Sequence, residues 1–227
     1  MQVIISYDII CFGDDMFSVI FDMDGTLLDT QRICIPAWEY AGLLQGINGM
    51  GDHVVNVCGT NHAGSNKYLK DNFPTLDIEK FRADSLYYIN ENMIVRFKSG
   101  AKELLDYLKK RNIKIALATG TSRQSVEHHL KEVGIEDYFG ALVCGTEIEN
   151  GKPAPDIFLK CASLLGVNPE DCFVFEDSAN GIKGGFTAGM KCIGVPDVVE
   201  FDEETKKMLF KEMKTLDEAI ELFEGLK

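Results

Sequence analysis

The chain has 227 residues, of which 45% are hydrophobic and 26% are charged, the composition of a folded globular protein and not of a disordered or fibrous one. Its 36 acidic and 23 basic side chains give a formal net charge of −13. Because binding to nucleic acid or to anionic lipid requires a basic surface, this charge argues against both kinds of partner.

Short apolar runs alternate with helical patterns along the chain, which is typical of βαβ units and a parallel sheet. The first predicted strand is 17–22, and Met16 directly precedes it, so residues 1–15 either extend this strand or precede the true start of the protein. The other predicted strands are 113–118, 141–144, 172–176 and 191–195. Helices are predicted at about 99–111, 122–133, 154–166, 178–189 and 215–225. The strands are apolar on both sides, which predicts an α/β fold with a doubly wound, Rossmann-like parallel sheet covered by helices on both faces.

No strand-like run occurs between the first two predicted strands, from about residue 31 to residue 97. Apolar residues in this stretch recur at helical spacing instead, for example at Ile33, Ala37 and Ala41. A crossover between parallel strands needs only about a dozen residues. The long insertion therefore predicts a Rossmann-like core of residues 1–30 and 98–227 with an inserted α-helical cap domain of residues 31–97.

The cysteines and histidines show no pattern of a disulfide framework or a zinc site. Seven cysteines are scattered without a Cys-x-x-Cys pair, and the four histidines lack metal-ligand spacing. Scattered thiols are typical of a reducing compartment, and no apolar run reaches the length of a membrane span. We therefore expect a cytoplasmic protein with no membrane contact, as a monomer or weak oligomer.

Polar segments follow the first four predicted strands, at the edge where open parallel sheets bind ligands. In chain order they are Asp22-Met23-Asp24-Gly25-Thr26, Thr119-Gly120-Thr121-Ser122, Gly151-Lys152-Pro153 and Glu176-Asp177-Ser178. The four carboxylates among them, at Asp22, Asp24, Glu176 and Asp177, are expected to converge. Such a group of like charges must take up protons or hold a cation. Since all the ligands are oxygens, Mg²⁺ is the expected cofactor.

A phosphate group fits the remaining residues of these segments. Lys152 supplies a positive charge, and the Thr119 hydroxyl, with backbone N–H groups such as that of Gly120, can hold phosphoryl oxygens. No Ser-His or Cys-His arrangement and no P-loop motif is present, so a carboxylate is the candidate nucleophile. Asp22 lies at the strand end, and Asp24 can protonate the leaving oxygen and then activate water. Arg123 is either a further substrate contact or an exposed residue at a helix start.

Taken together, the four segments resemble the motifs of the haloacid dehalogenase superfamily, in the branch with a helical cap after the first strand. The resemblance runs from Met16 onward and is strongest for small phosphatases and β-phosphoglucomutase. It implies that Asp22 is the nucleophile and that Asp24 is the acid/base, whose backbone carbonyl also coordinates Mg²⁺. It further implies that Thr119 and Lys152 bind the phosphate, and that Asp177 binds the metal with Glu176 beside it.

The resemblance leaves two enzyme activities open. β-Phosphoglucomutase has a His on its first cap helix and an Arg in a cap loop, and these positions fall at Cys34 and His62 here. A thiol does not deliver protons near neutral pH as imidazole does, and His62, although a candidate substrate contact, cannot form a bidentate clamp on phosphate. We therefore predict a phosphomonoesterase that acts on a small phosphorylated metabolite, such as a sugar phosphate, through an aspartyl-phosphate. The alternatives are a phosphohexomutase and a non-catalytic phosphate-binding module, which the intact catalytic positions disfavour.

Overall fold

The computed structural model describes residues 17–58, residue 60 and residues 62–225, apart from the side chain of residue 62. The two interpretations of residues 1–15 therefore concern residues outside the described part of the chain. None of the described helices is long and apolar enough to cross a membrane.

Six parallel strands form one sheet in the order β3-β2-β1-β4-β5-β6. Their bounds are β1 Ser18–Phe21, β2 Ile115–Thr119, β3 Ala141–Cys144, β4 Cys172–Glu176, β5 Lys191–Gly194 and β6 Leu209–Glu212. This doubly wound order confirms the predicted α/β fold. The sequence pattern missed β6, because this edge strand exposes Phe210, Lys211 and Glu212 and so lacks the buried apolar run that marks the other strands.

Helices cover both faces of the sheet, as the two-sided apolar strands require. Along β1, Val19 and Phe21 pack on one face and Ile20 on the other, which is the period of two of a strand. The first face is covered by α4 (Ala101–Lys110), α5 (Arg123–Val133) and α9 (Glu218–Glu224), and the second by α6 (Asp156–Leu165) and α7 (Ala179–Thr187). The remaining helices of this part are α8 (Glu203–Lys206) and three short 3₁₀ helices, Glu136–Tyr138, Gly145–Glu147 and Pro169–Asp171.

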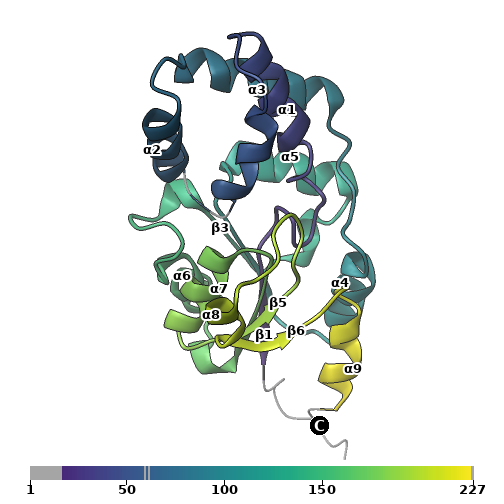
Figure 1. The fold of residues 1–227 in the computed structure, drawn as a ribbon. Coiled ribbons are helices and arrows are strands. Elements are labelled where there is room, and N and C mark those ends of the chain that lie inside the picture. Colours follow the sequence, from purple (N-terminus) through teal and green to yellow (C-terminus); the bar gives the residue numbers. More distant parts are fainter. Residues whose placement is uncertain (1–16, 59, 61, 226–227) are drawn as a thin grey trace, which may run out of the picture.

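The segment between β1 and α4 folds as helices above the carboxyl edge of the sheet (Figure 1). These are α1 (Cys34–Leu43), the 3₁₀ helix η1 (Met50–Asn56), α2 (His62–Asn72) and α3 (Ile78–Asn92). They pack around a hydrophobic cluster of their own, in which Trp38 meets Phe81 edge to face at 5.2 Å. The arrangement is consistent with the predicted cap domain, whose boundaries at 30/31 and 97/98 remain predictions.

The two connections between these helices and the sheet lie side by side and share one buried acid. The Asp29 N–H donates to the Arg96 carbonyl, and the Lys98 N–H donates to the Leu27 carbonyl, each at 2.9 Å. Asp197, in the loop after β5, has a fully buried side chain and pairs with Lys98 at 2.6 Å and Arg32 at 2.8 Å. One carboxylate therefore neutralises a cation from each connection.

Replacement of Asp197 by Asn tests whether this shared ion pair holds the connections. Removing one partner of a buried ion pair leaves the other charge uncompensated. Because Lys98 is largely buried but Arg32 is largely exposed to water, we expect the free energy of unfolding to fall by about 2–3 kcal/mol. Urea denaturation measures this loss. Asp71→Asn is the matched control, because Asp71 pairs with Lys67 at the surface and its loss should cost under about 1 kcal/mol. Equal losses in the two variants would contradict the role assigned to Asp197.

Candidate active site

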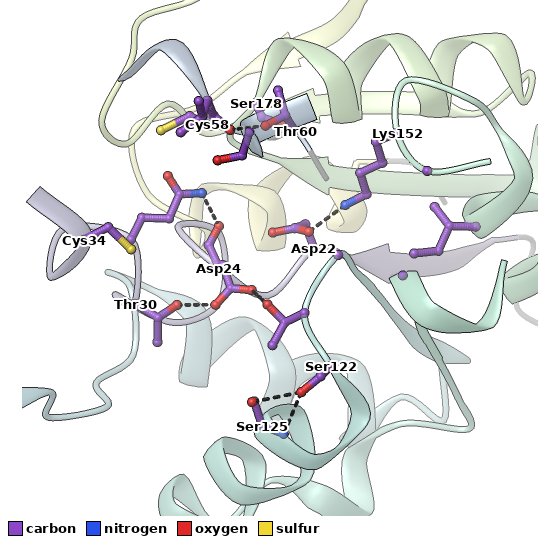
Figure 2. A pocket seen from close by; sticks show the side chains of 18 of the residues that line it. Asp22, Asp24, Thr30, Cys34, Cys58, Thr60, Ser122, Ser125, Lys152 and Ser178 are labelled. Carbon is purple, nitrogen blue, oxygen red and sulfur yellow. Dashed lines mark hydrogen bonds and ion pairs between the residues drawn. The ribbon is translucent and has the colours of Figure 1, made fainter. Parts of the chain in front are cut away.

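A cavity of about 600 Å³ lies between the carboxyl ends of the strands and the helices α1–α3 (Figure 2). From the sheet side it is lined by Asp22, Asp24, Gly120, Lys152, Glu176 and Asp177. From the helical side it is lined by Cys34, Trp38, Cys58 and Arg82, among others. The structure thus brings most of the predicted site residues to one cavity.

The strand order explains why these residues meet. The strand order reverses between β1 and β4, because β2 and β3 are added on one side of β1, and β4, β5 and β6 on the other, and doubly wound sheets bind ligands at this place. Phe21 of β1 is in register with Phe175 of β4, so Asp22 emerges beside Glu176 and Asp177. β2 pairs with β1 on the side opposite to β4, and its last residue is Thr119.

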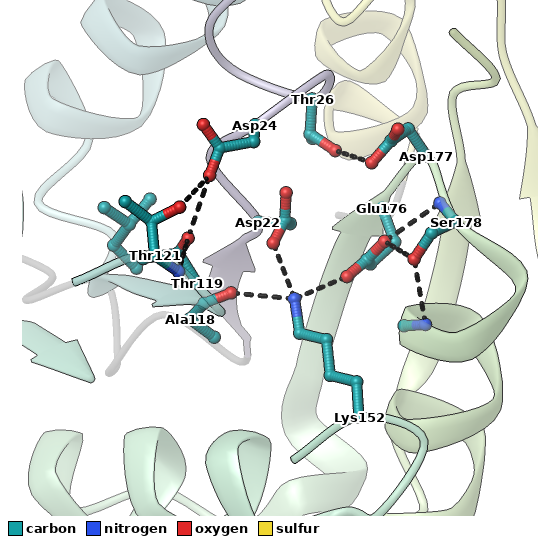
Figure 3. Close-up of polar contacts among 12 residues, drawn as sticks. Asp22, Asp24, Thr26, Ala118, Thr119, Thr121, Lys152, Glu176, Asp177 and Ser178 are labelled. Atoms are coloured by element: carbon teal, nitrogen blue, oxygen red, sulfur yellow. Dashed lines mark hydrogen bonds and ion pairs between the residues drawn. The ribbon is translucent and has the colours of Figure 1, made fainter. Parts of the chain in front are cut away.

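Lys152 joins three of the segments through its ammonium group (Figure 3). Its Nζ donates to Asp22 Oδ1 and Glu176 Oε1, both at 2.6 Å, and to the Ala118 carbonyl at 2.9 Å. The side chains of Lys152, Asp22 and Glu176 are each less than 10% exposed. All three N–H donors are used, so one lysine balances two buried carboxylates and cannot also balance Asp177.

The charges at this site are strongly coupled. Burial raises the pKa of Asp22 well above its ordinary value, against the opposing effect of Lys152, and Glu176 and Asp24 raise it further. Burial likewise raises the pKa of Asp177, with Glu176 and Asp22 adding to the shift. For Lys152, burial alone lowers the pKa, but the two carboxylates outweigh it and the net pKa is raised. The site therefore holds more negative charge than its lysine compensates, and a cation would relieve the excess.

Three buried carboxylates are arranged to hold such a cation. Asp22, Glu176 and Asp177 each offer one oxygen within 4.8 Å of the others. Glu176 is the least available, since Oε1 accepts from Lys152 and Oε2 accepts from the Ser178 N–H at 3.0 Å and its hydroxyl at 2.9 Å. An all-oxygen donor set fits Mg²⁺.

The backbone carbonyl oxygen of Asp24, and not its carboxylate, lies beside these acidic groups. Nε2 of Gln31 donates to the Asp24 carbonyl at 2.7 Å and to Asp177 Oδ2 at 2.8 Å, so these two oxygens lie close together. The carboxylate instead accepts hydrogen bonds from the hydroxyls of Thr30 at 2.6 Å, Thr121 at 2.7 Å and Thr119 at 3.2 Å. It is thereby held at the cavity wall, on the side of β2.

The carboxylates of Asp177 and Glu176 occupy space that is open only because glycines lie next to them. Gly25 has a φ of +83°, and a Cβ there would lie 2.5 Å from Asp177 Oδ2. A Cβ on Gly181, in the first turn of α7, would lie 1.8 Å from the Glu176 carboxylate. A side chain at either position would displace an acidic group of the site.

Cys34, the position of the mutase histidine in the resemblance, lies in the cavity wall. Burial raises the pKa of its thiol to about 12, with Asp24 and Cys58 adding to the effect. Cys34 is therefore neutral near physiological pH and is a poor proton donor.

Two of the predicted substrate contacts are not brought to the cavity by any described contact. Arg123 starts α5, but its Nε donates to Glu147 at 2.6 Å and its Nη2 to the Leu142 carbonyl at 2.8 Å, so the guanidinium is directed at the loop after β3. Arg123 is not among the residues that line the cavity, and neither is the fully buried Thr119, so their assignments as substrate or phosphate contacts remain predictions. His62 is the first residue of α2, and its side chain lies outside the described part of the structure.

Thr30, Gln31, Thr121 and Arg82 are among the polar residues of the cavity to which the sequence analysis assigns no role. Thr121 was within a predicted segment but was given no role. For Arg82 a signal existed, because it lies four residues after Ile78 and next to Phe81, on the apolar side of α3. A charge at such a position indicates a cavity or a buried partner.

Comparison with known proteins identifies the family. A model of the haloacid dehalogenase-like hydrolases matches residues 19–195. The phosphorylated carbohydrates phosphatase of Thermotoga maritima is 31% identical over 183 residues, or 78% of this chain and 84% of that protein. The β-phosphoglucomutase of Bacillus subtilis is 34% identical over 191 residues, or 79% and 83% of the two chains. The crystal structure of β-phosphoglucomutase from Clostridium difficile has a TM-score of 0.73 at 26% identity and covers 92% of this chain and 97% of that one. The chain therefore belongs to the haloacid dehalogenase-like hydrolases.

Proposed function

We propose that this protein is a Mg²⁺-dependent phosphomonoesterase that hydrolyses a small organic phosphate, such as a sugar phosphate, through an aspartyl-phosphate on Asp22. The observation that carries the proposal is the buried contact of Lys152 with both Asp22 and Glu176, beside Asp177. The name of the Thermotoga relative, a phosphatase of phosphorylated carbohydrates, supports this choice of substrate class. A cytoplasmic location and a monomeric or weakly associating state remain predictions from the sequence.

In the first step, an oxygen of Asp22 attacks the phosphorus and the bond from phosphorus to the substrate oxygen breaks. Oδ1 of Asp22 is held by Lys152, and Figure 3 shows the second oxygen pointing away from the lysine toward the side of Asp24 and Asp177. This second oxygen is the one we assign as the attacking atom. Lys152 at the same time stabilises the charge on the phosphoryl group.

Asp24 is assigned to both proton transfers. In its protonated form it gives its proton to the leaving alcohol oxygen, and as a carboxylate it then takes a proton from the water that attacks the aspartyl-phosphate. Hydrolysis regenerates Asp22 and releases inorganic phosphate. The hydroxyls of Thr30, Thr119 and Thr121 fix the orientation of Asp24.

Asp22, Asp177 and the Asp24 carbonyl are the oxygens we assign to the metal, and Glu176 serves to position Lys152. A bound Mg²⁺ would supply charge neutralisation for the phosphoryl oxygens. The backbone N–H of Gly120 would bind a further phosphoryl oxygen, and the Thr119 hydroxyl would do so once its single proton turns from Asp24 to the substrate.

Hydrolysis is favoured over the mutase reaction by the chemistry of Cys34. A mutase must return the phosphoryl group to a sugar hydroxyl, and the resemblance places a histidine of the mutase cap, which can transfer protons, at this position. The neutral Cys34 thiol does not provide one near neutral pH.

Asp22→Asn tests the nucleophile. Because an amide oxygen cannot form the acyl phosphate, we expect release of phosphate from p-nitrophenyl phosphate to fall ~1,000-fold or more. Asp106→Asn is the matched control, since Asp106 lies on the surface of α4 and pairs with Lys102. Circular dichroism checks that both variants fold. Full activity of a folded Asp22→Asn protein would refute the assignment.

Mg²⁺ should stabilise the protein in a pH-dependent way. The pKa values of Asp22 and Asp177 are raised by burial, so protons compete with the metal more strongly as pH falls, while at higher pH both groups are free to bind it. We expect millimolar Mg²⁺ to raise Tm more at about pH 8 than at about pH 5, and a chelator to reverse the rise. Asp177→Asn should lose most of this stabilisation. The same rise in Tm at both pH values, or in the variant, would contradict the assigned metal site.

The mutase alternative is tested directly with β-glucose 1-phosphate and a hexose bisphosphate primer. We expect inorganic phosphate to be released with no accumulation of glucose 6-phosphate. Isomerisation without net release of phosphate would overturn the assignment as a hydrolase.

A further inference from the structure

Arg82 is a cation of the helical side of the cavity, opposite the acidic end. It lies on α3 and is half-buried in the cavity wall near Trp38 and Cys34. Its Nη2 donates to the Ser65 hydroxyl at 2.5 Å and to the Asn66 side-chain oxygen at 3.0 Å, and its Nε donates to the same oxygen at 3.3 Å. The guanidinium also lies over the Trp38 ring, 5.7 Å from the centroid.

All of these contacts are with uncharged groups. No carboxylate of the described residues lies within 4.0 Å of the guanidinium, whereas Arg32, Arg111 and Arg123 each pair with an acid. Loss of hydration lowers the pKa of Arg82, which means that its surroundings disfavour the charged form. A guanidinium nevertheless stays charged in proteins, so the cavity contains a positive charge without an anionic partner.

A purely structural role explains part of this arrangement. Arg82 links α3 to Ser65 and Asn66 of α2, and its stem packs on Trp38. A neutral side chain could make such links without the cost of burying a charge. The structural role therefore does not account for a charged group, nor for its position in the wall of the cavity.

Arg82, Cys34 and the residues of the reacting end line the same cavity. The Cys34 thiol is close enough to feel both the negative charge of Asp24 and the positive charge of Arg82. A molecule whose phosphate lies at Asp22 and Lys152 would thus have its far end beside Arg82. At the near end, the ammonium group of Lys152 is already paired with two carboxylates, whereas Arg82 is bonded only to neutral groups among the described residues.

We propose that Arg82 binds a second anionic group, a carboxylate or a phosphate, at the end of the substrate remote from the phosphate that is hydrolysed. The preferred substrates are then small phosphate esters with an anionic tail. This inference rests on the proposed phosphatase function and adds the substrate class to it. A guanidinium suits this role because its planar N–H groups match both carboxylate and phosphate oxygens.

Two pairs of substrates test the proposal. Glycerol 3-phosphate and 3-phosphoglycerate share a three-carbon skeleton and differ in a neutral or carboxylate end. Fructose 1-phosphate and fructose 1,6-bisphosphate differ in a neutral or phosphate end. We expect wild-type protein to show a kcat/KM at least tenfold higher for the anionic member of one pair, and the pair that responds identifies the tail.

Arg82→Gln should bring this ratio close to one, mainly through KM, and Arg82→Lys should keep part of the preference. Arg111→Gln is the matched control, because Arg111 ends α4 and pairs with Glu224 of α9. Its ratio should equal that of wild type.

Three outcomes would overturn the inference. One is a wild-type protein that hydrolyses both members of each pair equally well, a result that does not depend on the folding of any variant. Another is an Arg82→Gln protein that loses activity equally on both members, since this would place Arg82 at the reacting phosphate or in the fold. The third is a Gln variant that keeps the full preference. Failure of the proposed function is distinguishable, because wild-type protein would then hydrolyse none of the four substrates.

Discussion

The site depends on an imbalance of charge: buried carboxylates gather around one ammonium group that cannot neutralise them all. Two like charges about 4 Å apart repel by roughly 4 kcal/mol at an effective dielectric of 20. The three donors of Lys152 are spent on Asp22, Glu176 and the Ala118 carbonyl. Asp177 instead accepts hydrogen bonds from the Thr26 hydroxyl and the Gln31 amide, neither of which carries a charge. The remaining negative charge is the basis on which we propose that this end of the cavity binds a cation and, with it, a phosphate.

This cluster of carboxylates also depends on residues that take no part in the proposed reaction. The order of the strands places β1 beside β4, although about 150 residues separate them in sequence. The carboxylates of Asp177 and Glu176 then occupy the space next to Gly25 and Gly181, where no Cβ would fit. Asp197 ties the two connections of the helical segment close to the same edge of the sheet. The fold and the site are therefore constrained by the same few positions.

The sequence predicts those parts of the structure that depend on local patterns, such as an apolar run or a polar motif beside it. Buried strands such as β4 carry continuous apolar runs, and motif residues such as Asp22 and Lys152 stand directly beside them. The edge strand β6 has no such run, because Phe210, Lys211 and Glu212 are exposed to water. Arg123 had a suitable position in sequence, but its guanidinium is drawn to Glu147, a residue 24 positions away. Contacts of this kind depend on how loops pack, and the hydrophobic periodicity of the sequence does not predict them.

The negative charge of the whole protein also bears on how it treats an anionic substrate. With a formal net charge of −13, the long-range field repels a phosphate ester, so association gains nothing from electrostatic steering. Attraction must arise inside the cavity, where low exposure strengthens each interaction and salt screens it less. In the proposed site, Lys152 and a bound cation would provide it at one end of the cavity, and Arg82 would provide it at the other. Cations at both ends favour a ligand that is charged at both ends, because a neutral tail would leave the buried guanidinium unpaired.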